Sequence, residues 1–284
     1  MYEPHQIQQQ DVLIHHPIIR CAYNDGVADS LVVSQVLDYY SETLRHHLKA
    51  QAFLQRRGIY QPDLLAHFRL GFADRSLGLQ LRKLGHLQEE TVRGALQRVG
   101  LLRTSGHELL RGAVLFPVLD QRGQILGGYG RRITPKLTAN SAYHVHWHLE
   151  HRCFFNQAAL FEFPELILCK SPLEALTWWC HGHHNVAAIL GFAGFGDEHL
   201  SILQSSLVRL VYIAFGASRS ELDASRRIAQ LLADNSIEVR LVLFPLGLDS
   251  NGFASSVDDP AKELSRLLED ALALPKRAGG DHEH

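Results

Sequence analysis

The second half of the sequence alternates between short apolar runs and segments with helical spacing, and this alternation constrains the fold more than any other feature. Between residues 165 and 245, runs rich in Val, Ile and Leu are separated by segments whose apolar residues recur every three or four positions. The predicted strands are 166–169, 186–190, 208–215 and 237–244, and the predicted helices are 172–181, 197–205 and 220–234. This order is typical of a parallel sheet with helices on both faces. We therefore predict an α/β fold whose C-terminal part is a doubly wound parallel sheet.

The first half has a different pattern, which makes the whole chain α+β. Apolar spacing predicts helices at 30–54, 62–68 and 88–98. AVLFPVLD and QILGGYGRRI are predicted as two strands joined by a tight turn at residues 120–123. We predict a polar leader (1–27), a helical and hairpin subdomain (28–160), the sheet domain (161–258), and a C-terminal helix (260–274) within a final segment that ends in a polar tail (259–284).

Composition limits the classes of function. The chain of 284 residues is 46% hydrophobic and 20% charged, which suits a globular protein with a real core. No apolar run reaches membrane-spanning length, and the four cysteines lack paired spacing, so we expect a cytoplasmic protein without a membrane partner. The net charge of −2 means that any nucleic-acid binding must depend on a local basic patch.

Two motifs carry a resemblance to a known family. FLQRRGIYQPDLLAHFRLGFA (53–73) and RGAVLFPVLDQRGQILGGYGRRI (111–133) resemble the patterns YLxxRGL…FxLGYA and RΦxFPIxDxxGxΦΦGFGGR of the DnaG-type DNA primase core. PLGLDSNGF (245–253) resembles the PxGKDPxxF pattern of that family's TOPRIM domain. The resemblance covers residues 50–255 and is closest to primase-like proteins of phages and mobile elements. Such proteins usually begin with a zinc ribbon, and no CxxH or CxxC pair precedes the core here.

The resemblance also implies a metal site. The residues at the positions of its metal-binding acids carry no carboxylate. In TOPRIM domains a Glu after the first strand and a DxD after the third hold magnesium for phosphoryl transfer. Lys170 stands where that Glu belongs, and Gly216 and Ser218 replace the two aspartates. Glu174 and Asp249 are residual acids at matching positions. We therefore predict no catalytic residues and no cofactor, with magnesium bound only if the remaining acids rebuild the site.

Two further acids belong to the neighbourhood of that site. Glu221 and Asp223 are predicted at the start of a helix, where carboxylates stabilise the N-terminal dipole.

Basic residues near the second motif predict a nucleic-acid interface. Arg131 matches the arginine of the GFGGR pattern, and Arg132 and Lys136 extend a basic strip beside it. Arginine forks bind phosphate with two parallel hydrogen bonds. Lys170 either binds phosphate on the same surface or pairs with Glu174 one turn later, and the sequence leaves both open. The predicted partners are DNA or RNA, together with proteins of a replication or mobile-element complex.

Histidines form two local clusters without familiar zinc spacing, so we predict no metal there. The residues are His144, His146 and His148, which would share one face of a strand, and His181, His183 and His184. The favoured function is a noncatalytic, primase-like TOPRIM protein that binds nucleic acid or assembles with proteins. The alternatives are an active primase or nuclease with a rebuilt metal site, and a purely protein-binding subunit.

Overall fold

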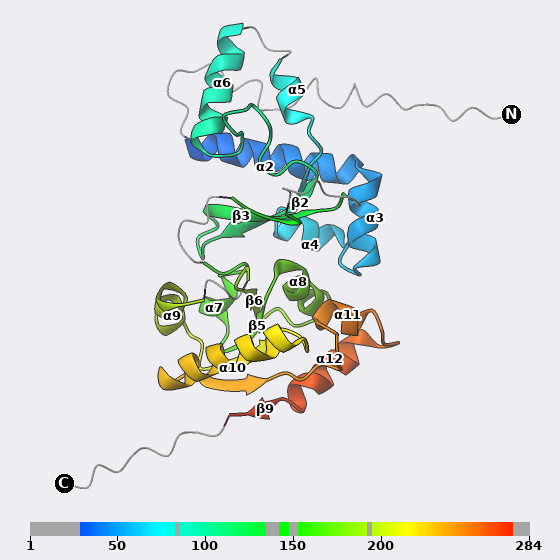
Figure 1. The fold of residues 1–284 in the computed structure, drawn as a ribbon, viewed down its shortest axis with the longest axis vertical. Coiled ribbons are helices and arrows are strands. Elements are labelled where there is room, and N and C mark those ends of the chain that lie inside the picture. Colours follow the sequence, from blue (N-terminus) through cyan, green and yellow to red (C-terminus); the bar gives the residue numbers. More distant parts are fainter. Residues whose placement is uncertain (1–28, 83–85, 135–141, 148–152, 192–194, 275–284) are drawn as a thin grey trace, which may run out of the picture. The chain divides into compact units, whose positions relative to one another are not determined.

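A computed structural model describes residues 29–82, 86–134, 142–147, 153–191 and 195–274 (Figure 1). The described residues of 1–51, 69–115 and 130–148 form a compact N-terminal unit, and those of 52–68, 116–129 and 149–284 form a C-terminal unit. The units interleave along the sequence, whereas the predicted domains follow one another with a boundary at residue 161. The predicted leader and the polar end of the tail lie outside the described residues.

The first long helix is interrupted, which corrects the prediction of one helix over 30–54. Helix α2 spans Asp29–His46 and α3 spans Leu48–Arg56. His47 lies between them, and its Nδ1 accepts a hydrogen bond from the amide of Ala50 at 3.2 Å. The imidazole thus satisfies one of the free N–H groups at the start of α3, as a capping side chain does. Apolar spacing continues through such a break, so the sequence pattern does not reveal it.

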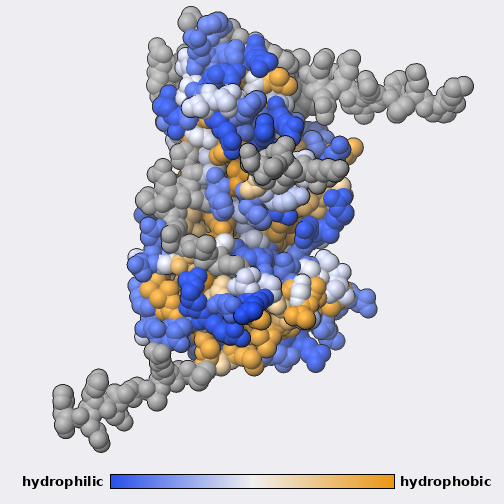
Figure 2. Space-filling view, viewed as in Figure 1, coloured by the Kyte–Doolittle hydropathy of each residue, from blue (hydrophilic) through white to orange (hydrophobic). Residues whose placement is uncertain are grey.

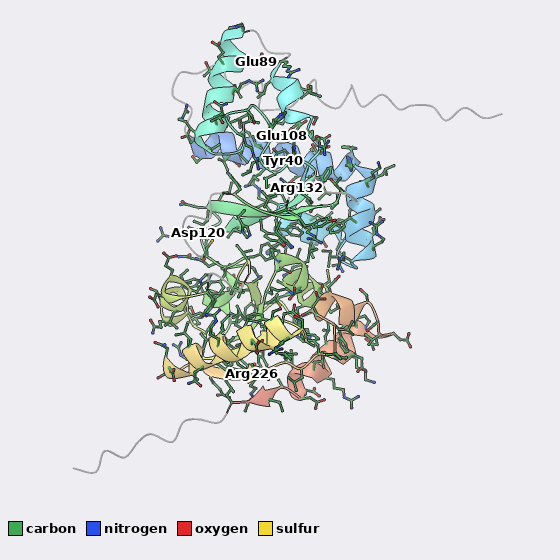
Figure 3. All side chains as sticks on the ribbon, in the orientation of Figure 1. Tyr40, Glu89, Glu108, Asp120, Arg132 and Arg226 are labelled. Carbon is green, nitrogen blue, oxygen red and sulfur yellow. The ribbon has the colours of Figure 1, made fainter. Side chains whose placement is uncertain are left out.

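Helix α2 of the N-terminal unit packs against strand β1 (Gly71–Ala73). A Cβ at Gly71 would lie 2.7 Å from the Cβ of Tyr40, so glycine permits this close approach. The Tyr40 hydroxyl donates to Glu108 Oε2 at 3.1 Å, and both residues are buried (Figure 3). Helices α5 (Leu77–Leu81) and α6 (His86–Arg98) follow β1. The sequence analysis predicted α6 but missed β1 and α5, which are too short to show a period.

The predicted hairpin is confirmed. Strand β2 spans Ala113–Leu119 and β3 spans Ile125–Arg132. The turn between them is closed by Asp120, whose Oδ1 accepts the amides of Arg122 and Gln124, each at 2.8 Å. Strand β4 (His144–Trp147) completes a four-stranded sheet of order β1-β2-β3-β4.

The predicted parallel sheet is also confirmed, in the C-terminal unit. Strands β5 (Glu165–Cys169), β6 (Val186–Ala188), β7 (Leu210–Ala214) and β8 (Glu238–Leu241) are all parallel and have the order β6-β5-β7-β8. Helices α8 (Pro172–Cys180), α9 (Asp197–Gln204) and α10 (Arg219–Asp234) connect them in the predicted alternation (Figure 1).

The end of the chain differs from the prediction of a helix over 260–274. Helix α12 spans Pro260–Glu269, and the chain then forms strand β9 (Leu272–Ala273), antiparallel to β8 at the sheet edge. An edge strand has unpaired backbone groups that a neighbouring extended segment satisfies, and this tertiary contact ends the helix early. The unit also contains three short helices, α4 (Pro62–His67), α7 (Ala159–Glu162) and α11 (Ser250–Ala254), of which only α4 was predicted.

Side chains of β5 alternate between the two faces of this sheet. Leu166 and Leu168 belong to a buried core that also contains Ile228 and Leu232 of α10. Helix α8 contacts β5 and β6 and contributes the fully buried Trp178. Figure 2 shows hydrophobic surface on the visible face of the C-terminal unit. Separately, the exposed large apolar side chains among the described residues of this unit are Leu207, Leu243, Leu246 and Leu272. No helix in the described part of the chain is long and apolar enough to cross a membrane.

Candidate functional site

The carboxyl ends of the parallel strands bring together the segments that the sequence predicted for the metal site. Cys169 of β5 is in register with Ala214 of β7, so the residues that follow these strands lie at the same edge. Lys170 follows β5 directly, and Gly216 follows β7 by two residues. The prediction that these two residues lie at the carboxyl ends of adjacent parallel strands is confirmed.

Lys170 is the centre of a largely buried ion-pair cluster. Its Nζ lies 3.3 Å from Glu174 Oε1 and donates a hydrogen bond to Glu221 Oε1. We call these three residues the lysine-centred cluster. Burial lowers the pKa of Lys170, but the carboxylates of Glu174 and Glu221 outweigh it and raise that pKa to about 12. The pairing with Glu174 was one of the two alternatives from sequence, and the pairing with Glu221 was missed.

Glu221 connects the ammonium to the start of α10. Its Oε2 accepts the amide of Ser218 at 2.9 Å, and its own amide donates to Ser218 Oγ at 3.4 Å, which makes a reciprocal capping box. Burial raises the pKa of Glu221, but the hydrogen bonds from Lys170 and Ser218 outweigh it and lower that pKa. The prediction that Glu221 opens a helix is confirmed. Asp223 also lies in its early turns and pairs with Arg226 at 3.2 Å.

Gly216 is required by the position of Glu221. Gly216 has a φ of +113°, a conformation that residues with a side chain rarely adopt. A Cβ at this position would lie 2.7 Å from Glu221 Oε2. An aspartate at 216 therefore cannot coexist with Glu221 in its observed place. The glycine at 216 and the glutamate at 221 are therefore physically coupled.

The two residual acids also have partners in the fold. Ser171 Oγ donates to Glu174 Oε1 at 3.0 Å, while the buried Glu174 Oε2 has no hydrogen-bond partner among the described residues. Burial raises the pKa of Glu174, and the neighbouring ammonium of Lys170 opposes that rise and favours the carboxylate. Asp249 Oδ1 accepts the amide of Gly252 at 2.8 Å and caps α11.

These donors do not suit a divalent metal ion. Magnesium binds oxygen ligands at short range, and an ammonium group beside the same oxygens opposes it by charge and by volume. Lys170 Nζ already contacts one carboxylate oxygen of Glu174 and one of Glu221. In the described ranges, no group of three or more His, Cys, Asp or Glu side chains is arranged to hold a metal ion. The arrangement suits a fixed ammonium ion in place of a metal.

The predicted basic strip lies on the N-terminal unit. Arg131 Nη1 lies 3.1 Å from His144 Nε2, and its guanidinium lies 4.9 Å from the centroid of the Tyr143 ring. Arg132 Nη1 donates to the carbonyl of Ala142 at 2.5 Å. Lys136 lies outside the described residues. The contacts of these residues in the described part of the chain do not show whether they bind phosphate, so that role stays a prediction.

Two arginines beside this strip, Arg103 and Arg111, were not predicted from the sequence. Burial first, and then the positive charges of Arg103 and Arg111, lower the pKa of Arg132. The amide of Ile133 donates to the carbonyl of Gly112 at 3.0 Å, which brings the segment around Arg111 next to the end of β3. Within the described residues, Arg103, Arg111 and Arg132 form no ion pair with an acid. They lie on separate segments, so no sequence spacing indicates that they gather.

The histidine clusters are partly described. His144 and His146 share the exposed face of β4, as predicted, and His148 lies outside the described residues. His183 Nε2 lies 3.1 Å from Ser265 Oγ, and the His184 ring stacks on Trp179 with centroids 4.6 Å apart. The second cluster therefore makes packing and hydrogen-bond contacts in the C-terminal unit.

Comparison with known proteins identifies the relatives of this chain. Residues 39–164 match the family described as DNA primase catalytic core, N-terminal domain. The chain is 25% identical over 246 residues to the DNA primase of Campylobacter jejuni, covering 83% of this chain and 39% of that protein. Over residues 39–164 this chain is homologous to the N-terminal domain of the DnaG-type DNA primase catalytic core.

Solved primase structures have the same fold. The zinc-binding and RNA polymerase domains of Aquifex aeolicus primase match with a TM-score of 0.71 and 24% identity, over 87% of this chain and 63% of that one. A DnaG primase catalytic domain bound to single-stranded DNA matches with a TM-score of 0.69 and 18% identity, over 86% of this chain and 79% of that one. The primase homologue spans less than half the length of the curated relatives it matches.

Proposed function

We propose that this primase homologue is a noncatalytic, nucleic-acid-binding module of DNA-replication or mobile-element machinery, with a TOPRIM-like C-terminal unit. The observation that carries the catalytic half of this proposal is the lysine-centred cluster. Phosphoryl transfer depends on cations that neutralise charge on the transferring group. Here the ammonium of Lys170, after strand β5, is already paired with Glu174 and Glu221. The cytoplasmic setting expected from the cysteines is part of the same proposal.

The nucleic-acid half of the proposal depends on the arginines of the N-terminal unit. Arg103, Arg111 and Arg132 are close enough for their charges to oppose one another, and the described residues offer them no acidic partner. Like charges without counterions destabilise a fold, and a polyanion such as a phosphate backbone relieves that repulsion. Arg131 and Lys136 belong to the same proposed interface. Lys170 as a phosphate contact stays a prediction from sequence, and its two ion pairs favour a structural role.

Binding measured across a salt series tests the nucleic-acid half. Fluorescence anisotropy of labelled single-stranded DNA and RNA would be recorded with the full chain. The double variant Arg111→Ala with Arg132→Ala is compared with Arg226→Ala, an exposed arginine of the C-terminal unit. If each arginine contacts a phosphate, the slope of log K against log salt falls by about 0.7 per contact for a single strand. Equal slopes for the double variant and the control, or no binding at low salt, would refute the interface.

Protein assembly is the second candidate function, because the C-terminal unit exposes apolar side chains. Leu246 is 93% exposed, and Leu243 and Leu272 are about half exposed. Exposed apolar groups gathered on one surface often mark protein interfaces. If the chain binds no nucleic acid at low salt, this reading takes precedence, and Leu246→Ser should then weaken the complex with its protein partner.

A further inference from the structure

The lysine-centred cluster places two carboxylates from different helices around one ammonium. Glu174 comes from α8 and Glu221 from α10, and both are largely buried. A serine holds each carboxylate in place: Ser171 donates to Glu174, and the amide of Ser218 donates to Glu221. Two anchored carboxylates repel each other in a partly desolvated site unless a cation lies between them. Lys170 is that cation.

We propose that the ammonium of Lys170 holds the carboxylates of Glu174 and Glu221 together at the carboxyl ends of the parallel strands, in the absence of a divalent ion. Removing its ammonium while leaving space would turn the same carboxylates into a site for a hard divalent cation such as Mg²⁺ or Mn²⁺. The inference goes beyond the proposed nucleic-acid role and does not depend on it, because every residue concerned belongs to the C-terminal unit.

Three observations support this role. Within the described part of the chain, the buried Glu174 Oε2 has no hydrogen-bond partner, so the cluster retains an unused carboxylate oxygen. Glu221 Oε1 would lose the hydrogen bond from Lys170 if the ammonium were removed. The negative charge of Asp249 acts on Lys170 and Glu174 alike, so the surroundings also favour a cation. Magnesium is commonly held by one or two carboxylates together with water. The oxygens of Glu174 and Glu221 meet this requirement once Nζ is gone.

Gly216 supports this role of Lys170 independently of the ion pairs. Its missing side chain leaves the space that the Glu221 carboxylate fills, as the 2.7 Å approach of a Cβ shows. In this position the carboxylate accepts the hydrogen bond from Lys170. The lysine, the glycine and the glutamate act together, and a substitution of Lys170 alone would leave the other two in place to accept a metal ion.

The experiment uses the full chain and separates the loss of charge from the loss of side-chain volume at position 170. Lys170→Ala removes both the charge and the volume, whereas Lys170→Met removes the charge and keeps most of the volume. Lys262→Ala, an exposed lysine on α12, is the matched control for loss of one positive charge. Lys170→Ala combined with Glu174→Gln removes a carboxylate ligand. Each protein is unfolded thermally with and without millimolar MgCl2, and Mn²⁺ binding is measured by electron paramagnetic resonance.

The expected pattern is specific. Lys170→Ala and Lys170→Met both unfold at a lower temperature than the wild type. Only Lys170→Ala binds Mn²⁺, and saturating MgCl2 raises its Tm by roughly 2–4 °C. The wild type, Lys262→Ala and the variant that also carries Glu174→Gln do not respond to MgCl2.

Three results would overturn the inference. The first is that Lys170→Ala is as stable as the wild type. The second is that it is less stable but that neither Mg²⁺ raises its Tm nor Mn²⁺ binds. The third is that the wild type responds to these ions as strongly as Lys170→Ala does. If Lys170→Ala folds poorly, its refolding yield with and without MgCl2 replaces the Tm, and equal yields contradict the proposal. None of these readouts depends on nucleic acid, so failure here and failure of the proposed interface are distinguishable.

Discussion

Replacing Gly216 by alanine tests the coupling between this glycine and Glu221. The added Cβ would lie 2.7 Å from Glu221 Oε2 and 3.0 Å from its Cδ, so the carboxylate must move. Moving it breaks the bond from the Ser218 amide and the bond from Lys170. Loss of a helix cap costs about 1 kcal/mol, and loss of a charged hydrogen bond about 1.5–3 kcal/mol. Because Glu221 remains able to find new partners, we expect a net loss of roughly 2–4 kcal/mol from this displacement.

A second glycine separates this displacement from backbone strain. Gly191 has a φ of +111°, close to the +113° of Gly216, and a Cβ at Gly191 meets no atom of the described residues within 4 Å. Gly191→Ala therefore costs the conformational strain alone, roughly 1–3 kcal/mol. The difference between the two alanine variants isolates the effect on Glu221.

Urea unfolding followed by circular dichroism provides the free energies. Gly216→Ala should be less stable than Gly191→Ala by the roughly 2–4 kcal/mol attributed to Glu221. In a Glu221→Ala background the carboxylate is absent, and the two glycine substitutions should then cost the same. The reasoning is wrong if Gly216→Ala costs no more than Gly191→Ala, or if the excess persists without Glu221.

Two further predictions concern buried polar groups. Burial raises the pKa of Glu108 from its ordinary value of 4.5 to about 7, so the folded chain loses stability as pH rises from about 4.5 to 7. Glu108→Gln removes this dependence. In urea titrations, the free energy of unfolding of this variant relative to the wild type should increase by about 2–3 kcal/mol between pH 5 and pH 8. A difference that does not change with pH would contradict the raised pKa of Glu108. Asn251 is 2% exposed and bonds both the side chain and the carbonyl of Arg57, as well as Thr177 Oγ1. Asn251→Ala should cost about 2–4 kcal/mol, and a loss under about 1 kcal/mol would show that these partners find others.

Most of the C-terminal sheet could be predicted from sequence because its strands are continuous apolar runs. The runs around 166–169 and 208–215 are buried on both faces, and burial of that kind leaves a clear signal in composition. The shortest elements could not be predicted in this way. Strand β1 has three residues and β9 has two, and both form because a partner strand supplies their hydrogen bonds. A tertiary contact of this kind leaves no local pattern.

The candidate site was predicted in position but not in its internal contacts. Strand order placed Lys170 beside Gly216, and helical spacing placed Glu174 one turn from Lys170. The contact between Lys170 and Glu221 spans 51 residues, and no sequence spacing encodes it. The sequence predicted Glu221 only as an acid at the start of a helix, whereas the absent side chain of Gly216 explains why its carboxylate fits beside Lys170.

Template-directed primer synthesis tests the central claim most directly. The full chain would be incubated with a single-stranded DNA template, ribonucleotides and Mg²⁺, and the products separated on a denaturing gel. The account predicts no template-dependent product, because Lys170 occupies the cation position between Glu174 and Glu221. A product that requires Mg²⁺ and disappears in Glu174→Ala would contradict it and show that the remaining acids form a working metal site.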